Sequence, residues 1–312
     1  MSDFFLRFDL PKSEFTINHT HKLTFLGSCF SDEISKKALE SGFQVLSNPF
    51  GTIYNPISIA KNILDALNGN TTISFLQRDE MYYSWDASTK IAAKSKSEVE
   101  QIILSKNNNL REHIGLPGFL FVTFGTAFIY KLKEQNRYVA NCHKQPSQLF
   151  KKELVDLEDV IDIWTNLIKK LQLFNPNLKI VFTVSPVRHI RDGIIENNRS
   201  KARLIQAVEK LTELNDVEYF PSYEIVIDEL RDYRFFKEDR IHPSEEATKY
   251  IWKRFSDLYF DDQTKKDVVA IFKVRKRLAH RTEKSIDLDT NTLKSIQYLE
   301  NQFPWVQWNV EK

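Results

Sequence analysis

The chain has 312 residues, of which 42% are apolar and 28% charged, and this ordinary globular composition excludes a disordered or fibrous protein. Its 44 basic residues nearly balance the 42 acidic ones, and a net charge of +2 provides no field for nucleic acid or an anionic membrane. Two cysteines, Cys29 and Cys142, are too few for a disulfide framework. The N-terminal residues show no basic segment followed by an apolar run, and no apolar stretch approaches the roughly 18 residues that span a bilayer. These features predict a cytoplasmic protein without a membrane span.

Short apolar runs alternate with amphipathic segments from about residue 20 to residue 260. In chain order, strands are predicted near 23–26, 43–46, 119–124, 179–184 and 217–220, with helices near 31–40, 57–67, 154–174, 200–214 and 243–259. Such alternation predicts an α/β protein with a mainly parallel sheet and helices on both faces. Ligands of such sheets bind at the carboxyl ends of the strands.

Two segments depart from this alternation. Residues 71–118 contain an aromatic YYSW sequence and a polar helix, and we interpret them as an insertion. Residues 261–312 form charged helices that end in FPWVQW. Because Trp305 and Trp308 would make an exposed apolar patch if solvated, we expect this C-terminal extension to pack on the rest of the chain. The predicted organisation is one α/β domain over residues 1–260 with a helical extension over residues 261–312.

The sequence Gly27-Ser28-Cys29-Phe30 lies between a predicted buried strand and the helix that follows it. The N–H groups and the dipole at a helix N-terminus stabilise a thiolate, and they lower the pKa of a cysteine placed there. Gly27 would allow the sharp turn that directs the next side chains into the crevice. In the alternative interpretation, Ser28 only caps the helix and Cys29 is a small buried apolar residue.

Asp239 and His242 stand three residues apart, just before the last helix of the α/β region. Across a turn of this length the carboxylate can lie beside the imidazole, orient it and stabilise its cation. A base oriented in this way can activate a hydroxyl or thiol that the fold brings near. In the alternative interpretation, this is a surface loop in which Asp239 or Ser244 caps the helix.

Together the two motifs follow the chain order of the SGNH (GDSL-type) hydrolases. The sequence resembles the GSCFA-domain family in particular, which is named after the motif present here at residues 27–31. The resemblance continues through NPFGTIYNP (48–56), TFGTAF (123–128), NCHK (141–144), SPVRH (185–189), SKARL (200–204) and EDRIHPS (238–244). It implies a flavodoxin-like three-layer α/β/α sandwich, for which we expect the strand order 2-1-3-4-5. It also implies an esterase or acyltransferase that acts on a small-molecule or glycan acyl ester, forms a covalent acyl-enzyme and needs no cofactor.

The resemblance assigns the catalytic residues by position. Alignment with the superfamily sequence F-L-G-D-S-L places Cys29 at the nucleophile position, and Ser28 then replaces an aspartate. A shift of one residue would make Ser28 the nucleophile and would leave Cys29 in the core. We favour Cys29 and expect its thiol within about 4 Å of His242, the general base that Asp239 orients.

An oxyanion hole is also implied. Gly51 occupies the position of the glycine whose backbone N–H stabilises the oxyanion in the superfamily. Ala127 occupies the position of the usual asparagine, so Thr126 or Asn141 is the expected second donor. His143 is expected to line the same crevice.

Three further possibilities follow from other residues. Arg188, just after the predicted strand 179–184, could bind a substrate carboxylate or phosphate, or could pair with Asp192. A zinc site made of Cys29, Cys142, His143 and His242 is disfavoured, because adjacent ligands seldom reach one ion and no C-x₂-C spacing is present.

Two functions of other classes stay open. A binding module could keep the fold and the crevice while lacking the asparagine donor, and it would bind a ligand without turnover. A thiol redox protein would use Cys29 and Cys142, and would require their Cα atoms to lie within about 7 Å of each other.

Overall fold

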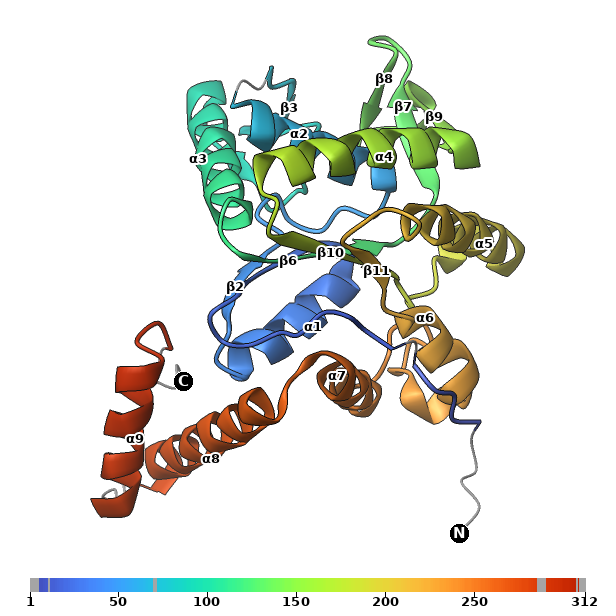
Figure 1. Cartoon of the computed structure of the whole chain (residues 1–312). Helices are drawn as coiled ribbons and strands as arrows, with labels where there is room; N and C mark the ends of the chain where they lie inside the picture. Colours follow the sequence, from blue (N-terminus) through green and yellow to red (C-terminus); the bar gives the residue numbers. More distant parts are fainter. Residues whose placement is uncertain (1–5, 11, 70–71, 285–289, 307, 309–312) are drawn as a thin grey trace.

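The computed structural model describes residues 6–10, 12–69, 72–284, 290–306 and 308. Its central sheet has five parallel strands in the order β2-β1-β6-β10-β11 (Figure 1). They are β1 (Lys22–Gly27), β2 (Gln44–Ser47), β6 (Gly118–Phe124), β10 (Leu178–Val184) and β11 (Val217–Tyr219). The order is the predicted 2-1-3-4-5, and each strand overlaps the range expected from the sequence.

Helices cover both faces of this sheet, and the fold is therefore a three-layer α/β/α sandwich (Figure 1). One face carries α2 (Pro56–Asn68), α3 (Lys96–Ile114), α4 (Leu157–Phe174) and α5 (Ile194–Leu211), and the other carries α1 (Cys29–Glu40) and α7 (Glu245–Tyr259). Successive side chains of a strand point to opposite faces, so the strands supply two cores at once. Leu120 and Val122 pack with the first group of helices, whereas Phe119 and Phe121 pack with α1 and α7.

Side chains at the helix starts decide where several helices begin. Ser28, Asn55, Ser95 and Ser244 precede α1, α2, α3 and α7, and each side chain accepts a hydrogen bond from a backbone N–H of the first turn. Such caps satisfy donors that have no partner inside the helix, and each stabilises the fold by about 1 kcal/mol. For α7, the cap is Ser244, so Asp239 is free for another role.

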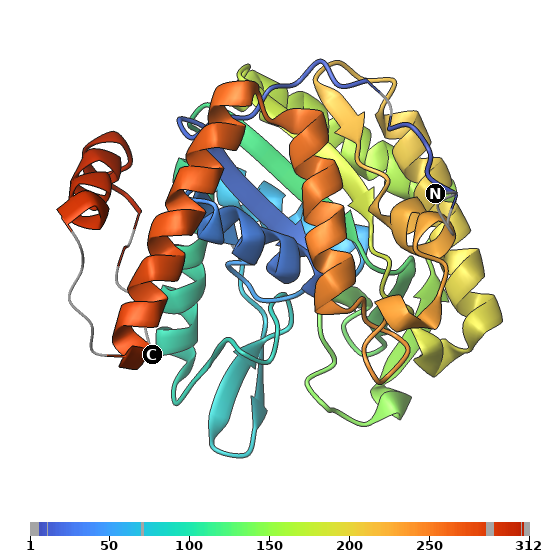
Figure 2. The same ribbon diagram turned by 90° about the horizontal axis from the view of Figure 1, so that it is seen from below.

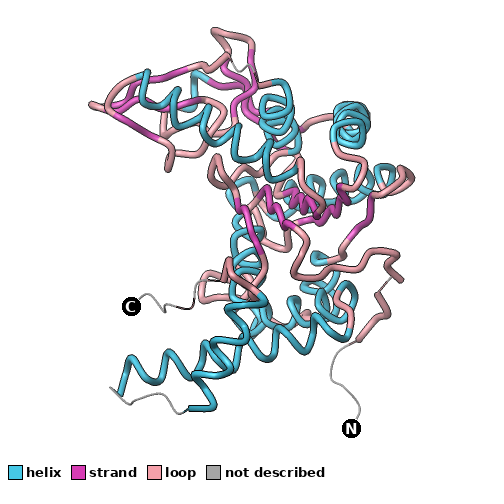
Figure 3. The backbone as a smooth tube through the Cα atoms, turned by 60° about the vertical axis from the view of Figure 1, so that its left-hand side comes forward, coloured by secondary structure: helices cyan, strands magenta, loops and turns pink. Residues whose placement is uncertain are grey.

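Two small antiparallel sheets, which the sequence analysis does not predict, lie on the side of the molecule away from the N-terminus (Figure 3). One has the order β3-β4-β5 and the other the order β8-β7-β9. Their strands are β3 (Phe75–Arg78), β4 (Met81–Ser84), β5 (Ala92–Ala93), β7 (Phe128–Leu132), β8 (Arg137–Val139) and β9 (Phe150–Leu154). Because residues 150–154 pair with β7, the helix expected over 154–174 begins only at Leu157.

The helices α8 (Asp262–Lys284) and α9 (Thr290–Gln302) follow α7, and α8 passes the C-terminal end of α1 (Figure 2). The half-buried Trp305 donates its indole N–H to the carbonyl of Gly42 over 2.9 Å. Arg275 of α8 donates to the carbonyls of Leu39 and Glu40 over 3.1 and 2.8 Å. These contacts connect the C-terminal helices to the end of α1, while the division of the chain near residue 260 stays a prediction.

Candidate active site

The site begins where β1 ends and α1 starts. The chain turns at Gly27, which has a φ of +134°, and a Cβ atom at Gly27 would lie only 2.1 Å from the carbonyl oxygen of Thr123 on β6. Glycine alone fits this close approach of two strands. Because β1 lies between β2 and β6, the turn places Ser28 and Cys29 at the carboxyl edge where the strand order reverses, the usual ligand site of such sheets.

Ser28 is fully buried and caps α1. Its Oγ accepts a hydrogen bond from the N–H of Phe30 over 3.3 Å, and its own N–H donates to the carbonyl of Thr123 over 3.2 Å. Cys29 is partly exposed. The capping role that the sequence allows for Ser28 is therefore present, and of the two residues Cys29 is the one that a substrate can reach.

Cys29 and His242 line the same small pocket. Its volume of about 20 Å³ is enough for one water molecule. The other residues around it come from α1, from the loop after β10, from the segment that leads into α7 and from α7 itself: Phe30, Glu33, Val187, Lys237, Pro243 and Thr248. The fold therefore brings together a thiol and an imidazole that are more than two hundred residues apart in the chain.

Asp239 holds the imidazole of His242 from the other side. Its Oδ2 lies 2.7 Å from Nδ1 of His242, and its Oδ1 accepts from the backbone N–H groups of Ile241 and His242 over 2.9 and 3.0 Å. These backbone bonds, together with the imidazole bond, hold the pKa of Asp239 well below its usual range. An ionised carboxylate only accepts, so Nδ1 carries the proton and Nε2 of the neutral ring is the nitrogen that can take one.

Arg188 stabilises the loop that carries this pair. Its guanidinium donates to the carbonyl of Arg240 over 2.8 Å and lies 4.0 Å from the centre of the Phe236 ring. The pairing with Asp192 that the sequence suggests is not formed, because the carboxylate of Asp192 pairs with Lys152. With its guanidinium on a backbone carbonyl and an aromatic face, Arg188 supports the loop, and binding of a substrate anion by Arg188 stays a prediction.

The pKa of the Cys29 thiol is raised, which is the opposite of what its position at a helix N-terminus suggests. Burial is the largest cause, and the carboxylates of Asp32 and Glu33 act in the same direction. The backbone N–H groups of Cys29 and Phe30 lower the pKa but do not outweigh these effects. At neutral pH Cys29 is therefore a neutral thiol, and it needs a base to become a nucleophile.

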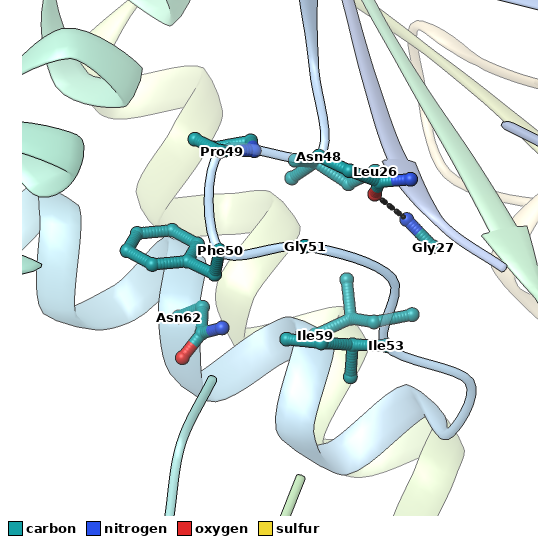
Figure 4. A pocket seen from close by; sticks show the side chains of 9 residues that line it. All are labelled: Leu26, Gly27, Asn48, Pro49, Phe50, Gly51, Ile53, Ile59 and Asn62. Atoms are coloured by element: carbon teal, nitrogen blue, oxygen red, sulfur yellow. Dashed lines mark hydrogen bonds between the residues drawn. The ribbon is translucent and has the colours of Figure 1, made fainter. Parts of the chain in front are cut away.

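Gly51, the first expected oxyanion donor, lies in the loop after β2 (Figure 4). Its N–H donates to the carbonyl of Asn48 over 2.7 Å and is therefore not available to an oxyanion. Its φ is +75°, and a Cβ atom at this position would lie 1.9 Å from Oγ of Ser88, so packing explains the glycine. Asn48 accepts from the N–H of Gly27 over 2.8 Å and donates to Asp32 over 2.7 Å, which ties this loop to β1 and α1.

Thr126, the second expected donor, is engaged as well. Its N–H donates to the carbonyl of Tyr54 over 3.0 Å, and its hydroxyl accepts from the N–H of Phe128 over 3.1 Å. The same hydroxyl lies 3.1 Å from Oγ of Ser200 on α5. The N–H groups that act on the sulfur of Cys29 are those of Cys29 itself and of Phe30, and the N–H of Phe30 also donates to Oγ of Ser28.

The Asn141–His143 loop packs against the small sheets. Asn141 accepts from the N–H of His143 over 2.7 Å, and Nε2 of the fully buried His143 lies 2.8 Å from the carbonyl of Ser84. Burial lowers the pKa of His143 to about 4, so its ring is neutral. Cys142 packs near Trp85, and burial raises the pKa of its thiol to about 11. His143 is thus engaged in the interior, and the expected contact of Asn141 and His143 with the crevice stays a prediction.

The zinc and redox interpretations gain no support from this arrangement. Cys29 and Cys142 are both free cysteines, and they pack with two different apolar clusters. In the part of the chain that the structure describes, no three His, Cys, Asp or Glu side chains are grouped so that they could hold a metal ion.

The sequence analysis misses two residues near Cys29. The ammonium of the buried Lys201 donates to the carbonyls of Gly125 and Ser185, each over 2.6 Å. The pKa of the Tyr54 hydroxyl is raised by burial and, to a lesser extent, by the side chain of Cys29. A signal for Lys201 exists in the sequence, because the predicted helix over 200–214 places it on the apolar face.

The fold and the site define a class of protein: a three-layer α/β/α sandwich with a thiol at the start of the first helix and an Asp–His pair before the last helix of the sandwich. The model of the GSCFA family matches residues 22–255, and the chain belongs to the GSCFA family.

Comparisons with curated proteins and with solved structures extend this result. A search of curated proteins found no match. Among solved structures, the acetyl xylan esterase Est2A from the rumen bacterium Butyrivibrio proteoclasticus is similar, with 11% identity and a TM-score of 0.38. The similarity covers 78% of this chain and 64% of the length of that one. As far as the structure describes the chain, it contains no helix with both the length and the apolar character to cross a bilayer.

Proposed function

We propose that the protein is an esterase or acyltransferase that acts on an acyl ester through a covalent acyl-enzyme intermediate. The observation that carries this proposal is the pocket shared by Cys29 and His242, in which Asp239 occupies Nδ1 of the imidazole and leaves Nε2 to accept a proton. The resemblance of the GSCFA family to the SGNH hydrolases supports ester chemistry, with a small-molecule or glycan acyl ester as substrate.

In the first step the sulfur of Cys29 attacks the acyl carbonyl carbon while Nε2 of His242 takes the thiol proton. Because burial and nearby carboxylates raise the pKa of Cys29, this proton transfer is required at neutral pH. Asp239 stabilises the imidazolium that forms. The backbone N–H of Cys29, at the start of α1, is the proposed oxyanion donor, since the N–H of Phe30 already donates to Oγ of Ser28.

In the second step the tetrahedral intermediate collapses, the C–O bond breaks, and His242 returns the proton to the leaving alkoxide. The product is an acyl-Cys29 thioester. Water or an acceptor alcohol then attacks the thioester while His242 again accepts a proton, and the thiol is restored as the carbon–sulfur bond breaks. Hydrolysis and acyl transfer differ only in this last nucleophile.

The test is turnover of an activated aryl acetate, together with intact-mass detection of an acetylated protein. We expect Cys29→Ala to abolish both signals, and Cys142→Ala to keep nearly full activity. Ser28→Ala should keep much of the activity while losing about 1 kcal/mol of stability with the helix cap. If Ser28→Ala were inactive and Cys29→Ala kept its activity, Ser28 and not Cys29 would be the nucleophile.

A ligand-binding module is the second candidate function. It is favoured by one observation, namely that the N–H groups of Gly51 and Thr126 are both occupied by other carbonyls. This function predicts saturable binding of an ester without turnover or acylation in the wild-type protein. Turnover that depends on Cys29 contradicts it.

A further inference from the structure

The helix α8 carries a local excess of positive charge. It contains eight basic and three acidic residues, whereas the whole chain has a net charge of only +2. The rest of the chain is therefore net negative, and the small total charge conceals an uneven distribution. The attraction of an anionic surface depends on such local charge, which the net charge of the chain does not show.

One face of α8 is directed into the molecule, because the buried Ile271 and Val274 pack with Leu299 of α9 and with Phe303. Figure 2 shows α8 on the near side of the molecule, in front of the central sheet. Spacings of three and four residues place five exposed side chains together on the side opposite the packed one. This outer face of α8 consists of Lys266, Val269, Phe272, Lys273 and Lys276.

The three lysines of the outer face have no carboxylate partner among the residues that the structure describes. The exposed lysines of α7 differ in this respect, because Lys249 pairs with Glu245 and Lys253 with Asp257, each over 2.7 Å. Between the lysines of the outer face, the only acidic residue in the sequence is Asp267, which is only partly exposed. Neighbouring like charges repel each other on an isolated helix, so this arrangement suits a helix that meets negative charge outside the molecule.

Two apolar side chains lie among these charges. Val269 is 51% exposed and Phe272 is 63% exposed. The phosphates of a nucleic acid duplex would attract the lysines but would offer no apolar surroundings to the phenyl ring. At a bilayer surface, the ring can enter the boundary between headgroups and acyl chains while the ammonium groups stay at the phosphates. The combination of charges and apolar groups therefore favours lipid over nucleic acid.

We propose that the outer face of α8 binds the surface of an anionic lipid bilayer. Phe272 enters the headgroup region, and the three lysines contact lipid phosphates. Each lysine close to such a surface strengthens binding about fivefold, so the binding is reversible and weakens as salt is added. The inference does not depend on the proposed ester chemistry and concerns a different part of the chain.

The experiment is sedimentation of the full chain with vesicles of pure phosphatidylcholine and with vesicles that also contain phosphatidylglycerol. We expect binding to the second kind only, with loss at high salt. Lys273→Gln/Lys276→Gln should lower the partition coefficient about 25-fold, and Phe272→Ser should lower it about tenfold. The matched control is Lys169→Gln/Lys170→Gln, which removes the same charge from exposed positions of α4, on the opposite side of the central sheet (Figure 1). This control should bind like the parent protein.

All these substitutions are at exposed positions, and circular dichroism checks that each variant folds. Equal losses in the two double-lysine variants would show that the total charge acts and would overturn the inference, as would a parent protein that binds neither kind of vesicle. Two results without vesicle binding would assign the outer face to another partner and would also overturn the inference. One is binding to duplex DNA, and the other is a dimer, seen by size-exclusion chromatography, that Phe272→Ser dissociates.

Discussion

Nδ1 of His242 lies 2.7 Å from Oδ2 of Asp239, three residues earlier in the chain. The same carboxylate accepts the backbone N–H groups that close the turn between them, so the turn and the orientation of the imidazole depend on one side chain. Both side chains are about two-fifths exposed, which leaves the ring accessible from the pocket of Cys29.

Asp239→Asn should therefore lower kcat/KM for an activated ester by about 100- to 10,000-fold. The new amide can donate to Nδ1, which moves the imidazole proton to Nε2 and removes the base from the side of Cys29. Steady-state kinetics measures the loss. Glu238→Gln, at the exposed neighbouring position, is the control and should be nearly as active as the wild type. Equal activity of the two variants would exclude the base role of His242.

Arg188→Met should lower kcat about tenfold and leave KM almost unchanged, because the guanidinium supports the carbonyl of Arg240 and through it the His242 loop. If Arg188 instead bound an anionic group of the substrate, KM would rise with kcat preserved. Arg191→Met, at an exposed position of the same loop, provides the comparison.

Glu33→Gln should accelerate alkylation of Cys29 about threefold near pH 8, because a carboxylate that disfavours the thiolate is removed. Glu33 also pairs with Lys237 over 3.1 Å, and the released ammonium lies in the same pocket as the thiol. Both changes lower the pKa of Cys29. Glu40→Gln, at the other end of α1, should have no effect, and a slower reaction of Glu33→Gln would contradict the electrostatic account.

Acid should destabilise the protein through its buried neutral histidines. Burial lowers the pKa values of His113, His143 and His189 to about 4 from an ordinary 6.5. Between these two pH values the unfolded chain binds protons that the folded chain does not, so the free energy of unfolding decreases as the pH falls from 6.5 toward 4.

His143→Gln should make this decrease shallower, by up to about 1.4 kcal/mol per pH unit. The glutamine amide can still donate to the carbonyl of Ser84, so the variant keeps this hydrogen bond and loses only the group that titrates. Urea unfolding at several pH values between about 5 and 7 measures the slope. Parallel slopes for variant and wild type would show that His143 takes up a proton in the folded state.

A chain that ends at Phe260 should lose solubility and lower its melting temperature by at least about 5 °C. Truncation removes the indole bond to Gly42 and the bonds of Arg275 to the end of α1, and it uncovers the apolar side chains around them. Differential scanning calorimetry and size-exclusion chromatography measure the two effects. Tyr298→Ala, at an exposed position of α9, should change neither the solubility nor the melting temperature. A truncated chain as stable as the full one would show that the C-terminal extension does not stabilise the α/β domain.

The sequence by itself determined the sandwich and the Asp–His turn. Runs such as 119–124 and 179–184 are mostly apolar without a strict alternation and are bounded by turn residues, which indicates strands buried on both faces. The pairing of Asp239 with His242 is equally local, because the carboxylate of Asp239 accepts only from groups two or three residues further along the chain. Interactions of such short range are encoded in spacing alone.

Only the tertiary structure decided the electrostatics of the site. The helix position of Cys29 predicts a lowered pKa, but burial under neighbouring elements and the acidic residues of its own first turns raise it. The expected donors of Gly51 and Thr126 are occupied by carbonyls of Asn48 and Tyr54, and the buried Lys201 donates to the carbonyls of Gly125 and Ser185 from a helix that the sequence shows only as amphipathic. Desolvation and long-range hydrogen bonds depend on which segments meet in space, and residue spacing along the chain does not contain that information.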